Sequence, residues 1–146
     1  MVLVDPWSPR VSAAQLAALP KEKPHESPQV AEERRFLTDY LSDPSQNSEH
    51  LLLTACNEEA ARLLDEPGPA LGDLPVVVLR APPPPYLPGL PRAYHAATLA
   101  AIDEGAKELA AESTHGTLVT VEDTGHNIQD DQPEAVIDAI RDVMAG

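Results

Sequence analysis

The 146-residue sequence has a single cysteine and no long hydrophobic run. Cys56 alone cannot form an internal disulfide, so nothing in the sequence points to an oxidising compartment. No window approaches the roughly 18 consecutive apolar residues of a transmembrane helix. The first residues also lack the basic and long apolar regions of a secretory signal. These features predict a soluble, cytoplasmic protein that does not enter membranes.

Basic and aromatic residues are also scarce. The chain has 10 Lys and Arg residues against 24 Asp and Glu residues, which gives a formal net charge of -14. Such an acidic protein repels phosphate backbones and anionic membrane surfaces, so direct nucleic-acid binding is not expected. Only 3% of the residues are aromatic while 42% are hydrophobic, so the apolar residues are mostly small or aliphatic. A chain of this length can form one domain that buries roughly 70% of its unfolded surface.

Three short aliphatic runs predict strands. Val2–Val4 is closed by Asp5-Pro6, residues 74–79 read LPVVVL, and residues 117–121 read TLVTV. The second run is continuous instead of alternating, which is typical of a strand in a parallel sheet with both faces covered.

Helical periodicity occurs between and after these runs. We expect helices over residues 28–44, 51–64 and 94–112, and a last helix led by Asp130, Asp131 and Pro133, because acids and proline are favoured in a first turn. The apolar positions at helical spacing are Val30, Phe36, Leu37, Tyr40 and Leu41 in the first of these helices, Leu99, Ile102, Ala106 and Leu109 in the third, and Val136, Ile140, Val143 and Met144 in the last.

The order of these segments predicts an α/β fold. Strand, helix, strand, helix in the second half indicates right-handed parallel βαβ units. We therefore expect a partial parallel sheet of about three strands with flanking helices, formed by residues 1–6 and 73–146, with residues 7–72 as a helical insertion. Pro82 to Pro85 cannot enter a helix and should run as extended polyproline, either as a stiff surface connector or as a ligand for an aromatic groove.

His126 is the candidate for chemistry. It follows a predicted strand and precedes a predicted amphipathic helix, and in open α/β sheets the functional sites lie at the carboxyl ends of strands. A histidine can act as a general base there because its ordinary pKa lies near neutrality.

The stretch VEDTGHNIQDDQPEAVIDAIRDVM resembles the carboxyl-terminal end of the α/β-hydrolase fold, where a Gly-His, a Gln-Pro-Glu-like turn and a closing helix carry the triad histidine. MVLVDP looks like the sixth strand of that family, LGDLPVVVL like the seventh and TLVTVED like the eighth, and residues 7–72 lie where many members insert a helical cap. The resemblance implies that His126 is a triad base of a serine hydrolase acting on esters or amides. It also implies that the chain corresponds to the latter half of the fold, with the first half missing.

The other triad members are harder to assign. The family's nucleophile sits in Gly-x-Ser-x-Gly, but no serine of this chain, nor Cys56, has a glycine two residues away, so we assign no nucleophile. The acid commonly follows the seventh strand, where residues 80–91 contain no Asp or Glu. Asp5, after the first strand, is the candidate that the resemblance leaves, although such an Asp often merely caps a turn. Glu122 and Asp123 are nearer to His126 in sequence.

His25, His50, His95 and His115 lack ligand-like spacing, so we expect no metal and no cofactor. The sequence favours a protein of hydrolase ancestry that is inactive as the isolated chain. Alternatives are a half-enzyme completed by a second chain, a non-catalytic interaction module, or a truncated sequence of a full enzyme. An exposed edge at Val2–Val4 would favour an oligomer or a partner chain.

Overall fold

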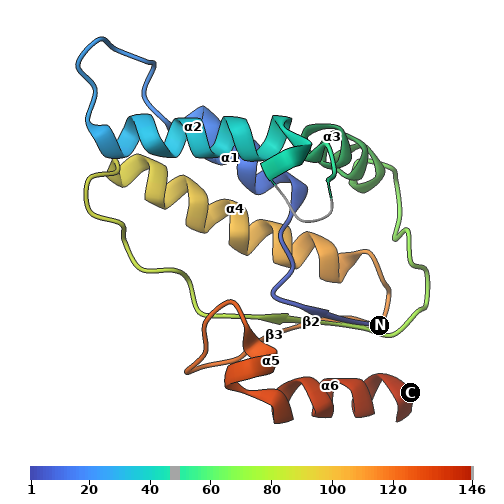
Figure 1. The fold of residues 1–146 in the computed structure, drawn as a ribbon. Helices are drawn as coiled ribbons and strands as arrows, with labels where there is room; N and C mark the ends of the chain where they lie inside the picture. Colours follow the sequence, from blue (N-terminus) through green and yellow to red (C-terminus); the bar gives the residue numbers. More distant parts are fainter. Residues whose placement is uncertain (47–49, 146) are drawn as a thin grey trace.

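The computed structural model describes residues 1–46 and 50–145, in which several helices follow the first strand and strands and helices alternate after it (Figure 1). The elements are β1 (Val2–Val4), α1 (Pro9–Ala18), α2 (Pro28–Ser42), the short 3₁₀ helix η1 (Pro44–Gln46), α3 (Leu53–Leu64), β2 (Val76–Arg80), α4 (Arg92–Ala111), β3 (Gly116–Thr120), α5 (Ile128–Asp131) and α6 (Pro133–Ala145).

The three strands form one parallel sheet in the order β1-β2-β3, which confirms the predicted α/β class with a three-stranded parallel sheet. Val4 lies opposite Leu79, and Leu79 lies opposite Val119, so the carboxyl ends of all three strands fall at the same edge. The loops that follow β1 and β3 therefore start close together on either side of β2.

Helices cover both faces of this sheet, as predicted for its central strand. Figure 1 shows α4 against one face, with α1, α2 and α3 beyond it, and α5 and α6 on the opposite face. Val76 and Val78 pack with Ala106 and Ala110 of α4, and Leu79 packs on the other side against residues that include Ile128. The small alanine side chains let α4 lie close to the sheet.

Gly105 of α4 provides the close contact between this core and the helical segment from residue 7 to residue 72. A Cβ atom at Gly105 would lie 2.3 Å from Cβ of Ser8, so only glycine fits there. Ser8 is the N-cap of α1, and its hydroxyl accepts a hydrogen bond from the backbone N–H of Arg10. The start of α1 is thus held against α4.

Further along the chain, α2 begins at Pro28 behind the N-cap Ser27, and it buries Val30, Leu37 and Leu41 as the periodicity predicts. Phe36 and Tyr40 lie outside this stripe and are exposed. Their place in the predicted apolar pattern therefore does not make them core residues.

The stripe predicted for the last helix is wrong in part. Ile140 and Met144 of α6 are exposed, whereas the small residue Ala139 is buried against the sheet. The sheet is only three strands wide, so α6 covers it with a narrow face formed by residues such as Val136 and Ala139. Within the described part of the chain, no helix combines the length and the apolar character that crossing a membrane requires.

Candidate active site

Asp5 and His126 meet at the carboxyl edge of the sheet. Asp5 directly follows β1, and His126 lies in the loop between β3 and α5. Nδ1 of His126 is 2.8 Å from Oδ2 of Asp5, although the two residues are 121 positions apart in the sequence. The topology therefore brings together the two residues that the sequence analysis singled out as acid and base.

The backbone around Asp5 holds its carboxylate in place. Its N–H donates to the carbonyl oxygen of Leu79, and its Oδ1 accepts from the N–H of Ala81 at 3.0 Å. One carboxylate oxygen of Asp5 thus binds the backbone just after β2 and the other contacts His126, so the side chain does not cap its own turn. Its φ of 40° lies in the left-handed region, which Asp tolerates better than most residues but at a cost in backbone strain.

This contact orients the imidazole. An ionised carboxylate only accepts hydrogen bonds, so the proton of a neutral His126 ring lies on Nδ1 and the lone pair lies on Nε2. The side chain of Asp5 is 20% exposed and that of His126 is 72% exposed. Nε2 of His126 is therefore the basic nitrogen, and the exposed imidazole ring that carries it is oriented by the partly buried carboxylate of Asp5.

Asp131 holds the loop that carries His126. Its Oδ2 accepts a hydrogen bond from the N–H of Gly125 at 2.8 Å and lies 3.2 Å from Oγ1 of Thr124. The sequence analysis treated Asp131 only as an acid favoured in a first helical turn. No local signal marked the contact with Gly125, because a capping carboxylate ordinarily accepts from N–H groups that follow it in the chain, and this one accepts from an N–H six residues earlier.

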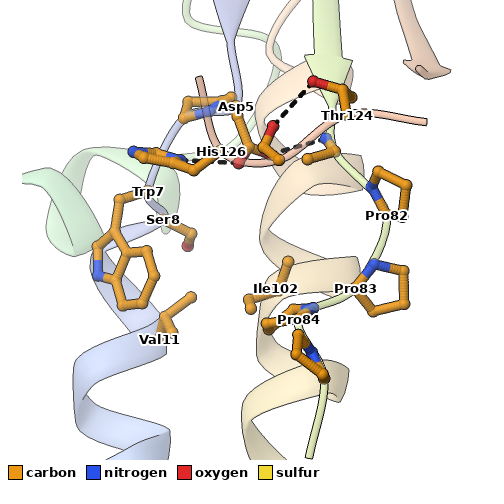
Figure 2. A pocket seen from close by; sticks show the side chains of 14 residues that line it. Asp5, Trp7, Ser8, Val11, Pro82, Pro83, Pro84, Ile102, Thr124 and His126 are labelled. Atoms are coloured by element: carbon orange, nitrogen blue, oxygen red, sulfur yellow. Dashed lines mark hydrogen bonds and ion pairs between the residues drawn. The ribbon is translucent and has the colours of Figure 1, made fainter. Parts of the chain in front are cut away.

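A cavity of about 370 Å³ lies beside the pair. Figure 2 shows Pro82, Pro83 and Pro84 on one side of this cavity and Trp7 and Val11 on the other, with Asp5 and His126 at one end. The proline run thus forms one wall of the cavity, and Trp7 is held there by a 3.3 Å hydrogen bond from its Nε1 to Oγ of Ser12.

A second cavity, of about 510 Å³, lies among α1, α2 and α3 and also reaches Trp7 and His126. Glu33 of α2 lines it, and one of its carboxylate oxygens accepts a hydrogen bond from the hydroxyl of Tyr94 on α4. Burial, and then this hydrogen bond, raise the pKa of Tyr94 above its ordinary value, so Tyr94 remains a neutral donor at neutral pH. Sequence reasoning missed Glu33 because nothing local distinguishes it from the other acids of α2.

The remaining candidates lie elsewhere. Glu122 and Asp123 are exposed, and His126 takes Asp5 as its partner instead. Cys56 is free and exposed on α3. Across residues 1–46 and 50–145, no cluster of three or more His, Cys, Asp or Glu side chains is placed to hold a metal ion.

Ser8 and Ser12 are the serines that line these cavities, and both are buried. Their hydroxyl oxygens accept hydrogen bonds from the N–H of Arg10 and from Trp7 respectively. Ser8 lies between β1 and α1, but it is buried as the N-cap of α1 instead of exposed on a sharp turn, and Ser12 lies within α1, so the structure does not add a nucleophile to the pair.

Together, the fold and the pair define an α/β protein with an Asp–His pair at the carboxyl edge of a three-stranded parallel sheet. No protein-family model, curated protein or solved structure matches this chain.

Proposed function

We propose that this chain is the acid–base part of a serine hydrolase of the α/β-hydrolase type, acting on esters or amides, with Asp5 as the acid and His126 as the base. The proposal rests on the 2.8 Å contact between Nδ1 of His126 and Oδ2 of Asp5. In such hydrolases the acid holds the imidazole in the tautomer that leaves Nε2 free to accept a proton.

The nucleophile belongs to a Gly-x-Ser-x-Gly segment outside these 146 residues, in another chain or in a longer form of this one. The serine hydroxyl attacks the carbonyl carbon of the substrate while its proton passes to Nε2 of His126. His126 then gives that proton to the leaving alcohol or amine as the acyl bond breaks. A water molecule hydrolyses the acyl-serine by the same route, with His126 taking and returning the proton.

Residues 7–72 are proposed to be the cap of this enzyme. They contribute α1, α2 and α3 between β1 and β2, and both cavities that reach His126 involve residues of α1 or its approach. A segment in this position would enclose the substrate and exclude water from the reacting carbonyl.

The alternative is a non-catalytic interaction module. The observation in its favour is the exposure of Tyr86 and Leu87, which continue the proline run, together with the position of β1 at the edge of the sheet. An edge strand offers unpaired backbone groups to another chain.

Active-site labelling in the native source separates these readings. Protein captured with an antibody against α6 is treated with a fluorophosphonate, which bonds covalently to activated serines. We expect the label on a Gly-x-Ser-x-Gly peptide, either in the same polypeptide or in one that copurifies with it. Replacement of His126 by alanine should slow labelling at least about a hundredfold, whereas His115→Ala, at an exposed loop histidine, should leave it unchanged.

Labelling that is equally fast in the His126→Ala variant would remove the proposed role of this residue, and the lack of any labelled serine would favour the interaction module. The isolated chain has no serine in the required motif and should form no acyl-enzyme. Mixing it with a nitrophenyl ester should therefore give no initial burst of nitrophenol.

A further inference from the structure

The cavity among α1, α2 and α3 has a polar composition that the proposed acid–base chemistry does not explain. It is lined by Gln15 from α1, by Glu33 from α2 and by Asn57 from α3, in addition to aliphatic and aromatic residues. Its volume of about 510 Å³ falls within the usual range of small-molecule sites.

Gln15 has an unsatisfied acceptor. The residue is only 7% exposed, and its Oε1 has no hydrogen-bond partner within residues 1–46 and 50–145. Buried polar atoms are almost always paired, and leaving one unpaired costs free energy. Oε1 is itself inaccessible, so an N–H donor in the cavity reaches it once the terminal amide of Gln15 turns toward the space that this residue lines, and such a contact would remove that cost.

Glu33 contributes a carboxylate to the lining of the cavity. One oxygen accepts from the Tyr94 hydroxyl, and no ion pair forms to Glu33 within the described ranges 1–46 and 50–145. The neighbouring cation, Arg34, pairs with Glu26 at 3.0 Å instead. An ionised carboxylate accepts several hydrogen bonds, so Glu33 has acceptor capacity left for a donor in the cavity.

Aromatic rings complete the lining. Trp7, Phe36 and Tyr40 are three of only five aromatic residues in the chain, and all three line this cavity. They are exposed, and the rings of Phe36 and Tyr40 stack with their centroids 5.4 Å apart. The faces of such rings attract organic cations, and tryptophan does so most strongly.

We propose that this cavity binds a small primary ammonium compound with an apolar body. The ammonium group donates to the free acceptor of Glu33 and to Oε1 of Gln15 after its terminal amide turns into the cavity, and the apolar body packs against Trp7, Phe36 and the leucines of α2 and α3. The net charge of -14 raises the local concentration of such cations around the whole protein.

The site goes beyond the proposed hydrolysis and does not depend on it, because binding requires neither Asp5 nor a nucleophile. In the proposed hydrolase, the ammonium site holds the part of the ester or amide that lies toward the helices, since His126 lines the same cavity.

Trp7 provides a direct readout, because it is the only tryptophan in the chain and lines the cavity. The isolated protein is titrated with phenethylammonium while Trp7 fluorescence is followed, and the affinity is checked by calorimetry. We expect saturable binding that is at least about tenfold tighter than that of phenethyl alcohol, which has the same shape but no charge. Glu33→Gln keeps an acceptor for Tyr94 and should weaken ammonium binding at least about tenfold.

The matched control is Glu32→Gln, which removes the same charge from the neighbouring, exposed position of α2 and should leave binding unchanged. Gln15→Met removes the unsatisfied acceptor while keeping the length of the side chain, and it should weaken binding about fivefold even if Glu33→Gln fails to fold. Equal affinity for the alcohol and the ammonium compound, or equal weakening by the Glu32 and Glu33 variants, would overturn the proposal.

Discussion

The two cavities that share Trp7 and His126 are built in different ways. The cavity at the sheet edge is organised by backbone: strand ends place Asp5, and main-chain N–H groups hold both its carboxylate and that of Asp131. The cavity among the helices is organised by side chains on α1, α2 and α3, and it keeps an unsatisfied acceptor on Gln15. The comparison indicates that the geometry of the first site is fixed by the strand order and the backbone hydrogen bonds of the sheet. The geometry of the second site depends on how the helical segment packs on α4.

The largest expected effect comes from breaking the contact that joins the two regions. Gly105→Val places a side chain against Ser8 and should lower the free energy of unfolding by about 3 kcal/mol, because neither helix can retreat without losing packing. Chemical denaturation measures this change. The control is Ala100→Val at an exposed position of α4, which should cost only a few tenths of a kcal/mol. Similar losses in both variants would show that the α1–α4 contact is unimportant.

The next effect concerns the tautomer of His126. In Asp5→Asn, the amide oxygen is required by the N–H of Ala81, so the amide NH₂ faces Nδ1 of His126 and favours the tautomer protonated at Nε2. Nitrogen NMR of the imidazole should therefore change from mainly Nδ1–H to mainly Nε2–H. Asp123→Asn, at an exposed position near His126 in sequence, should leave the tautomer unchanged. An unchanged spectrum in Asp5→Asn would contradict the orienting role of Asp5.

A smaller effect is expected at the loop that carries His126. Asp131→Asn replaces a charged acceptor of the Gly125 N–H by a neutral one and should lower stability by about 1 kcal/mol or less. The clearer readout is faster hydrogen exchange of the Gly125 amide. Asp130→Asn, the exposed neighbour, should leave that exchange unchanged. If the two variants exchange equally, the Asp131 carboxylate does not hold the loop.

The smallest effect is on the pH dependence of stability, through the ion pair between Arg80 of β2 and Asp103 of α4. Hydrogen bonds from Lys107 and then Arg80 hold the pKa of Asp103 below its ordinary value of 3.8. A lowered pKa in the folded state means that this group adds stability above pH 3.8, which is lost as the pH falls through the lower folded value. Melting temperatures measured against pH should therefore fall less steeply in acid for Asp103→Asn than for the unaltered protein. Glu122→Gln, at an exposed position, should keep the original slope.

Much of the fold could be predicted from local patterns. Val76 to Val78 form a strand because a continuous β-branched run suits a covered parallel strand, and α2 buries Val30 and Leu37 at the expected spacing. The same patterns misplaced Ile140 and Met144, because periodicity finds an apolar stripe but does not say how wide the facing sheet is.

The candidate site was predictable in part. His126 was found from its place between a strand and a helix, and Asp5 was left as the acid by the family resemblance, together with nearer alternatives. Asp131 was not singled out because its contact with Gly125 depends on how the loop between them folds back. Gln15 and Glu33 were not singled out because their partners or lack of partners depend on packing or on segments that are distant in sequence. Tyr94, for example, lies 61 residues from Glu33.

By itself, the sequence determined the strands, the approximate helices and the acidic surface, since each depends on residues within a few turns of one another. Only the tertiary structure decided which carboxylate meets His126. The parallel register that aligns Val4, Leu79 and Val119 brings the ends of β1 and β3 to one edge, so Asp5 reaches His126 while Asp123, far closer in sequence, remains exposed. Strand pairing, a contact between distant segments, overrides proximity along the chain.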